Sequence, residues 1–168
     1  MKNIAILVYG SLINKKELEG EGVDISSCIP VVLKGYTREF SQKSQRPIYI
    51  DSNNSVLIVL KDESCTLKGL LVPNIKEKDL EVLDYREAGY NRVKLSLDEL
   101  EFKYKENTQN IDEVYVYIGK DEFFDNTTIP IPIYLHICTT GARQWGEEFY
   151  EDFLDTTKVQ KQTLRSYL

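Results

Sequence analysis

The 168-residue chain is 42% hydrophobic and 29% charged, which is an ordinary balance for a globular protein with one buried core. Its net charge of -6, with no basic block, excludes the electrostatic pattern of a nucleic-acid binder, and no apolar stretch reaches the roughly 18 residues that span a bilayer. We therefore expect a single domain over residues 1–168 that binds a small polar ligand, with neither nucleic acid nor membrane as a partner.

Strand-forming residues dominate the first two thirds of the chain. Runs rich in β-branched and aromatic residues predict strands, in chain order, at 4–9, 30–40, 55–61, 66–72, 92–97 and 113–118. In the last of these, Val114, Val116 and Ile118 share one face, whereas Tyr115 and Tyr117 share the other. Two tyrosines on one face indicate either an amphipathic surface or a polar cavity.

A first helix is predicted within residues 74–89. Asn74 serves as its expected N-cap, Leu80 and Leu83 are spaced for one face, and Gly89 is the expected stop. The last third is a second helical zone, entered through Pro130 and Pro132. It carries apolar residues at helical spacing, which are Ile133, Ile137, Trp145, Phe149 and Phe153. The aromatic members form a stripe typical of core packing, so the whole pattern predicts an α+β domain built around a curved sheet or barrel.

The cysteines and the N-terminus bear on compartment and chemistry. Cys28, Cys65 and Cys138 are odd in number and lack C-x-x-C spacing, which argues against a disulfide framework and a zinc site and favours buried free thiols. The N-terminal apolar run is too short for a signal peptide, so we expect a cytoplasmic protein. His136 and Cys138 are two apart in a helical segment and face away from each other, which argues against a local Cys-His nucleophile.

Glu87 is an unusual residue in the first helix. It lies seven residues after Leu80 and four after Leu83, which places a carboxylate on the apolar stripe near the helix end. One interpretation is a frayed terminus that turns Glu87 to solvent, or a structural pair with Arg86 or Arg92. The other is a buried carboxylate with a raised pKa, suited to general acid/base catalysis.

The first strand ends at Tyr9-Gly10-Ser11. A glycine at this place lets the backbone approach a ligand closely, and successive N–H groups in the following turn can bind a carboxylate or an oxyanion. A plain tight turn is the alternative interpretation. The sequence has no P-loop, no Gly-x-Ser-x-Gly elbow and no His-Glu-x-x-His helix.

Three segments in order, VYGSLIN, LKGYTREF and LDYREAGYNRV, resemble the gamma-glutamylcyclotransferase superfamily, including its ChaC-like and AIG2-like branches. The glycine of CTLKGLLV and the late segment GEEFYEDFLDTT extend the resemblance over most of the chain. It implies a small mixed β-barrel with flanking helices and an enzyme that needs neither metal nor cofactor. It also implies that Glu87 is catalytic, that Tyr9, Gly10, Ser11 and Leu12 form the substrate-binding loop, and that Tyr117 is a pocket tyrosine.

The reaction implied is the cyclisation of a gamma-glutamyl amide to 5-oxoproline and a free amine. The substrate would be a gamma-glutamyl amino acid, a gamma-glutamylamine or glutathione, and a non-catalytic binding module of the same fold is the alternative. Two departures bear on specificity: Arg86-Glu87-Ala88-Gly89-Tyr90 is one residue shorter than the corresponding ChaC stretch, and Leu12 stands where other branches have Asn. Arg38 is expected to pair either with a substrate carboxylate or with a structural partner.

Overall fold

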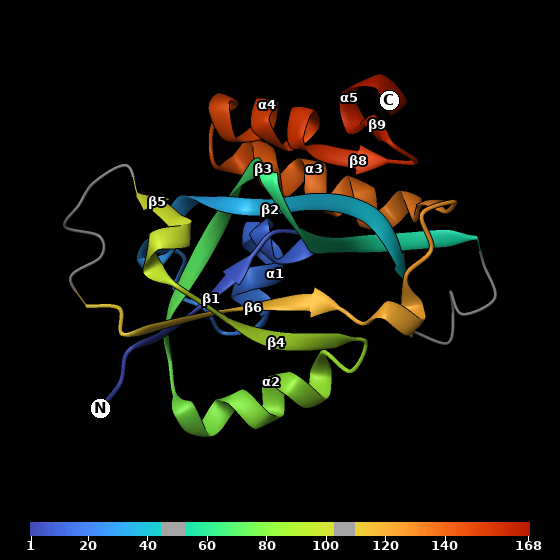
Figure 1. The fold of residues 1–168 in the computed structure, drawn as a ribbon. Coiled ribbons are helices and arrows are strands. Elements are labelled where there is room, and N and C mark those ends of the chain that lie inside the picture. Colours follow the sequence, from blue (N-terminus) through green and yellow to red (C-terminus); the bar gives the residue numbers. More distant parts are fainter. Residues whose placement is uncertain (45–52, 103–109) are drawn as a thin grey trace.

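Figure 1 shows the computed structural model of the chain, which describes residues 1–44, 53–102 and 110–168. Within these ranges the strands form one sheet in the order β4-β6-β1-β3-β2-β8-β9, with β5 paired to β2 and β7 paired to β3. The strands are β1 (Ile4–Val8), β2 (Ile29–Lys43), β3 (Asn54–Ile75), β4 (Tyr90–Leu95), β5 (Leu100–Phe102), β6 (Glu113–Gly119), β7 (Ile129–Pro130), β8 (Thr157–Val159) and β9 (Gln162–Thr163). The helices are α1 (Lys15–Gly20), α2 (Leu80–Arg86), α3 (Pro132–Gln144), α4 (Glu147–Thr156) and α5 (Leu164–Tyr167).

The α+β class is confirmed, but the sheet is not closed into the predicted barrel. Closure would need a ladder between the two edge strands, and in the described ranges the path runs from β4 at one end to β9 at the other. Figure 1 shows why these edges do not meet. Strand β4 lies beside α2 at the bottom of the molecule, whereas β8 and β9 lie beside α4 and α5 at the top.

Strand β1 lies in the middle of the sheet. It pairs in parallel with β6 and antiparallel with β3, and all five of its residues are buried. A continuous apolar run is what a strand covered on both faces requires, which is how the sequence predicted it. Because β1 is held on both sides, the loop that begins at Tyr9 has a fixed starting point.

Strands β2 and β3 form a long antiparallel ribbon. The predicted strands 55–61 and 66–72 are parts of the single strand β3, because the polar residues between them stay within the ribbon. The register shifts between Lys34 and Tyr36, opposite this polar stretch, and Gly35 there has a φ of 85°, which suits a residue without a Cβ. β5 pairs with the first half of β2 and β8 with the second half, on the two sides of this irregularity.

Helix α2 is shorter than the sequence predicted. Strand β3 continues to Ile75, and Asn74 lies within it at a φ of 65°, so the expected N-cap at Asn74 is wrong. A 3-10 turn, Glu77–Asp79, leads into α2, which ends at Arg86 with Glu87 as its C-cap. The following strand starts at Tyr90, two residues earlier than predicted.

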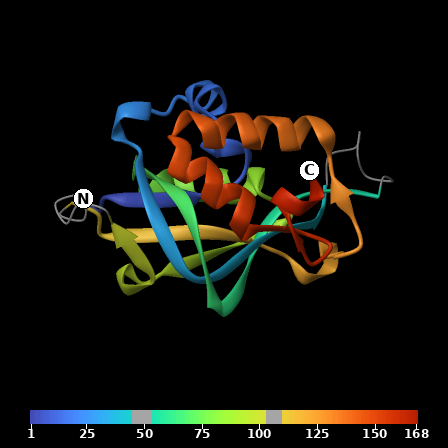
Figure 2. The same cartoon turned by 90° about the horizontal axis from the view of Figure 1, so that it is seen from above.

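The late helical zone is confirmed as α3 and α4, with α3 running along one side of the molecule in Figure 2. Phe149 and Phe153 are buried in the core, as the aromatic stripe predicted. Trp145 caps α3 and donates its Nε1–H to the carbonyl of Ile13 at 2.7 Å. Ile133, by contrast, is 61% exposed, so its spacing from Ile137 does not reflect packing into the core.

We predict that Gly141→Ala destabilises the fold. A Cβ at Gly141 would lie 2.6 Å from the backbone nitrogen of Asn14, so α3 would have to move away from the segment after β1. The expected loss is about 1–3 kcal/mol in the free energy of unfolding, measured by urea denaturation. Gly20→Ala is the control, since nothing lies within 4 Å of its Cβ position, and equal losses in both variants would contradict this packing.

Candidate active site

The loop after β1 begins with backbone N–H groups that its own turn does not use. Tyr9 is buried, and a 3-10 turn over Ser11–Ile13 follows it. The turn uses the N–H groups of Ile13 and Asn14, which donate to Gly10 and Ser11, each at 3.1 Å. The N–H groups of Ser11 and Leu12 precede the first of these bonds and have no acceptor among the described residues. The loop therefore presents adjacent N–H groups, as an anion site needs.

Gly10 is required because the Tyr134 side chain occupies the space beside it. A Cβ on Gly10 would lie 2.5 Å from the Tyr134 hydroxyl and 3.7 Å from the Cβ of Leu57. Tyr134 comes from α3, and Leu57 comes from β3. The close approach of backbone predicted at Gly10 is thus made by a tyrosine hydroxyl of the chain itself.

Glu87 lies in the tight turn between α2 and β4. Its N–H donates to the carbonyl of Leu83 and its carbonyl accepts from the N–H of Tyr90, both at 2.9 Å. The residue is half-buried. Each of the two nearby arginines pairs with another carboxylate, Arg86 with Glu21 at 2.6 Å and Arg92 with Asp84 at 3.4 Å.

The Glu87 carboxylate is close enough to the hydroxyls of Tyr9 and Tyr117 for its charge to act on both. Burial raises the pKa of Tyr9 well above its usual value, and the negative charge of Glu87 adds to this effect. Burial and the hydrogen bond to Asp84 raise the pKa of Tyr117, and Glu87 contributes again. The structure therefore brings the α2–β4 turn and the end of β1 to one place.

Tyr117 joins these two segments. Its carbonyl accepts a hydrogen bond from the Tyr9 hydroxyl at 2.6 Å, and its own hydroxyl donates to Oδ1 of Asp84 at 2.8 Å. Tyr115, on the same face of β6, donates to Glu113 at 2.8 Å. On this face of β6 both tyrosine hydroxyls therefore donate to carboxylates of the chain.

Leu57 is the junction that sequence reasoning missed. Its carbonyl accepts from the Tyr90 hydroxyl at 3.1 Å, and its N–H donates to the Tyr134 hydroxyl at 3.4 Å. Burial raises the pKa of Tyr134 well above its usual value, so this hydroxyl keeps its proton at neutral pH. The spacing of Tyr134 and Cys138, four apart on a helix, is the one local signal that could have indicated an inward-facing tyrosine.

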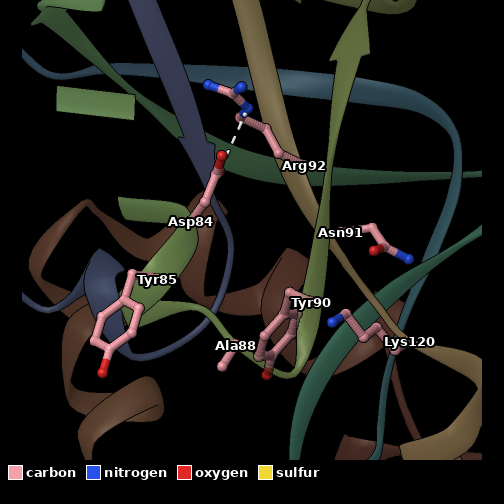
Figure 3. Close-up of a pocket in the computed structure, with 7 residues that line it drawn as sticks. All are labelled: Asp84, Tyr85, Ala88, Tyr90, Asn91, Arg92 and Lys120. Atoms are coloured by element: carbon pink, nitrogen blue, oxygen red, sulfur yellow. Dashed lines mark ion pairs between the residues drawn. The ribbon is translucent and has the colours of Figure 1, made fainter. Parts of the chain in front are cut away.

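A cavity of about 470 Å³ borders the Glu87 turn. Figure 3 shows its lining residues, with Tyr85 and Ala88 on one side, Asn91 and Lys120 on the other, and the Asp84–Arg92 ion pair above Tyr90. Asp84 and Tyr90 belong both to this cavity and to the hydrogen bonds around Glu87. None of the residues from Tyr9 to Leu12 lines it.

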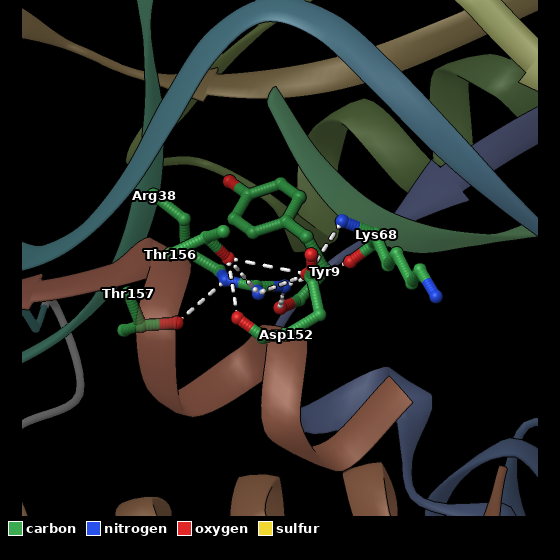
Figure 4. Close-up of polar contacts among 6 residues, drawn as sticks. All are labelled: Tyr9, Arg38, Lys68, Asp152, Thr156 and Thr157. Atoms are coloured by element: carbon green, nitrogen blue, oxygen red, sulfur yellow. Dashed lines mark hydrogen bonds and ion pairs between the residues drawn. The ribbon is translucent and has the colours of Figure 1, made fainter. Parts of the chain in front are cut away.

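Arg38 has the structural role that the sequence left open. Its side chain has no exposed surface, and Figure 4 shows its guanidinium among Tyr9, Lys68, Asp152, Thr156 and Thr157. Nη1 donates to the carbonyls of Tyr9 at 3.2 Å and Lys68 at 3.1 Å. The group is therefore taken up by protein acceptors and does not face a ligand carboxylate.

The remaining candidates for chemistry lie apart from this region or are unreactive. All three cysteines are free, and burial raises the pKa of Cys138 to about 12. His136 is exposed on the same helix and faces away from Cys138, as predicted. In the described part of the chain, no group of three or more His, Cys, Asp or Glu side chains is arranged to hold a metal ion. None of the described helices combines the length and the apolar character needed to cross a membrane.

Comparisons with known proteins match residues 4–129 to the family described as ChaC-like protein. Curated protein sequences gave no match. Among solved structures, a gamma-glutamyl cyclotransferase aligns with a TM-score of 0.62 and 15% identity over 89% of this chain and 85% of its own. A glutathione-specific yeast gamma-glutamyl cyclotransferase gives 0.59 and 16% over 99% of both chains, and an uncharacterized protein from Homo sapiens gives 0.65 and 14% over 90% and 86%.

We predict that Gly10→Ala destabilises the protein and that a second change restores it. The new methyl group displaces the Tyr134 hydroxyl, which costs about 1–3 kcal/mol in the free energy of unfolding. Adding Tyr134→Phe removes the clashing oxygen, so the double variant should be more stable than Gly10→Ala alone in thermal denaturation. If the two losses simply add, Tyr134 does not occupy this space.

Proposed function

Because the chain belongs to the ChaC-like protein family, we propose that it is a gamma-glutamylcyclotransferase that cleaves a gamma-glutamyl amide with Glu87 as the proton shuttle. An enzyme of this type is what the family and the fold support together. The observation that carries the assignment of Glu87 is that Tyr117 links the end of β1 to the helix that Glu87 caps, because it accepts from Tyr9 and donates to Asp84 of α2. The segments that meet there are far apart in the sequence.

The reaction needs little from the protein besides orientation and proton transfer. The substrate's α-amine attacks its own γ-carbonyl carbon, so a C–N bond forms within one molecule and closes a five-membered ring. The amide bond to the leaving nitrogen then breaks, which releases 5-oxoproline and a free amine. The α-ammonium loses one proton before attack, and the same nitrogen loses a second as the ring amide forms. The leaving nitrogen gains one proton as its bond to carbon breaks and takes up the other as a free ammonium, so a carboxylate that carries protons from one nitrogen to the other balances the step.

The surrounding groups suit Glu87 to this role. Burial holds the hydroxyls of Tyr9, Tyr117 and Tyr134 in their protonated forms, so they act as fixed dipoles. The N–H groups of Ser11 and Leu12 would bind the substrate carboxylate or the oxyanion that develops on the γ-carbonyl. Tyr9 and Gly10 set the position of these donors, and Tyr117 ties the loop to α2.

The cavity beside the Glu87 turn is the proposed place for the leaving amine. Its volume of about 470 Å³ is enough for an amino acid or a short peptide. Lys120 and Arg92 contribute positive charge, and among the described residues Arg92 is ion-paired to Asp84 whereas Lys120 has no ion-pair partner. This charge favours a leaving group that carries a carboxylate, as an amino acid or a peptide does, over a simple alkylamine.

We predict that Glu87→Gln abolishes turnover and leaves the fold intact. Gln keeps the shape but neither accepts nor returns a proton, so kcat should fall by about 10²–10⁴. The measurement is 5-oxoproline release from gamma-glutamyl-alanine, gamma-glutamyl-lysine and glutathione.

Glu81→Gln is the matched control, because this carboxylate is exposed on the same helix. Near-normal activity of Glu87→Gln would rule out the proton shuttle. Binding of these compounds by the parent protein without any 5-oxoproline would instead favour a non-catalytic binding module.

Lys120→Met should raise KM by about two- to fivefold for gamma-glutamyl-alanine, as expected for the loss of one partly exposed charge interaction. For gamma-glutamyl-ethylamide, whose leaving amine has no carboxylate, KM should not change. Lys94→Met, an exposed lysine of β4 outside the cavity, serves as control. Equal effects on both substrates would place the leaving group elsewhere.

A further inference from the structure

Arg38 on β2 fixes the carbonyl at the start of the substrate loop. Its Nη1 donates to the Tyr9 carbonyl, one peptide before Gly10 (Figure 4). A carbonyl bound by a buried cation cannot rotate freely, and the peptide that follows is held with it. The orientation of the N–H groups of Ser11 and Leu12 therefore depends on where the guanidinium lies.

The guanidinium is itself held from the opposite side. Its Nε donates to Thr157 at 2.8 Å and its Nη2 to Thr156 at 3.1 Å, while Asp152 lies 3.8 Å away. The group also stacks over the Phe153 ring at 4.4 Å. Burial lowers the pKa of Arg38 to about 10, which leaves it charged at neutral pH. Arg38 is thus a rigid link between the end of α4 and the loop.

Gln42, four residues further along β2, makes the matching contact to the other half of the site. Its side chain is buried, and its Nε2 donates to the carbonyl of Gly89 at 2.9 Å. The same carbonyl accepts from the N–H of Lys120 at 3.0 Å. Gly89 follows Glu87 by two residues in the α2–β4 turn, so this carbonyl is the anchor of the turn.

A contribution to stability does not explain why a glutamine is buried at position 42. Its Oε1 is buried without a hydrogen-bond partner among the described residues, and a buried acceptor in this state is unfavourable. A Cβ at position 119 would lie 2.5 Å from Oε1 and 2.6 Å from Cγ2 of Ile58, so the amide and the isoleucine together require glycine there. What the amide does provide is the single bond to Gly89.

A β-bulge lets one strand reach both halves of the site. Phe40 is opposite Leu57, but Gln42 is opposite Val56, because the register shifts between Phe40 and Gln42. Leu57 and Val56 are adjacent on β3, so their side chains face opposite sides of the sheet. Gln42, which lies opposite Val56, therefore faces away from the side that carries Arg38 and Phe40. Bulges of this kind re-aim side chains next to functional sites.

We propose that Arg38 and Gln42 are positioning residues that hold the substrate loop and the Glu87 turn, respectively, in register with each other. The proposal rests on the proposed function for its catalytic consequences. Neither side chain touches the substrate. Each acts through one backbone carbonyl, Arg38 through Tyr9 and Gln42 through Gly89.

The test separates binding from turnover. Gln42→Met keeps the length and removes both the donor and the unpaired oxygen, so we expect an unchanged or higher melting temperature. It should lower kcat by about 10- to 100-fold while KM stays within about twofold, since only the shuttle is misplaced. Arg38→Lys keeps the charge but cannot serve all the acceptors at once, and it should mainly raise KM.

Thr37→Val is the matched control on the same strand. The Thr37 hydroxyl is buried and unpartnered among the described residues, so its loss should change neither parameter. If Gln42→Met keeps the parent kcat, or if it loses kcat only together with melting temperature, the positioning role is overturned. The role would also be overturned if Gln42→Met and Arg38→Lys changed kcat and KM in the same way, because the two residues would then not hold different parts of the site.

Amide hydrogen exchange tests the contacts of Arg38 and Gln42 independently of activity. Gln42→Met should speed exchange at Tyr90 and Lys120, and Arg38→Lys at Ile13 and Asn14, with no effect of either variant on the other pair. Unchanged exchange at these amides would overturn the proposal. A parent protein inactive on every gamma-glutamyl substrate, but with the expected exchange pattern, would overturn the proposed function and leave the positioning contacts supported.

Discussion

A guanidinium with no exposed surface must have its donors satisfied, because an uncompensated buried charge is strongly destabilising. Arg38 meets this demand with the carbonyls of Tyr9 and Lys68 and the hydroxyls of Thr156 and Thr157. This one group ties its own strand, β2, to three other segments that are distant in the sequence. The loop after β1, the middle of β3 and the α4–β8 junction can therefore take up only one arrangement around β2.

The site follows from where these segments end. β1 and β6 are parallel neighbours, so Tyr9 and Tyr117 lie toward the same end of these two strands. The antiparallel strand β4 starts at that end, directly after the turn that carries Glu87. Tyrosine hydroxyls then bind backbone groups across the gaps, two of them at Leu57. The turn that carries Glu87 is thereby held next to the tyrosines at the end of β1, which is the structural basis of the activity proposed for this ChaC-like chain.

Two irregularities in the β2–β3 ribbon help to set the positions of the neighbouring strands and of the Gln42 side chain. The register shift at Gly35 lies between the part of β2 that pairs with β5 and the part that pairs with β8, and the shift at Ser41 turns Gln42 toward Gly89. The edges of the sheet stay apart, so the fold is an open α+β sheet with helices on two sides rather than a barrel. Bulges add twist and re-aim side chains without breaking a strand, which explains how one long ribbon serves the whole site.

The sequence by itself determined the elements with a clear period: the buried strand β1, the alternating strand β6, the two late helices and the helix that precedes Glu87. It left Tyr9-Gly10-Ser11 open between an anion-binding loop and a plain tight turn. Only the tertiary structure decided that β3 is one strand, that Asn74 is no cap and that Arg38 is structural. It also decided that Leu57, Tyr134 and Gln42 lie against the loop after β1 or the α2–β4 turn. The reason is physical: periodicity reports which face of an element is buried, whereas the partners of these side chains are backbone atoms of distant segments, and no local pattern records them.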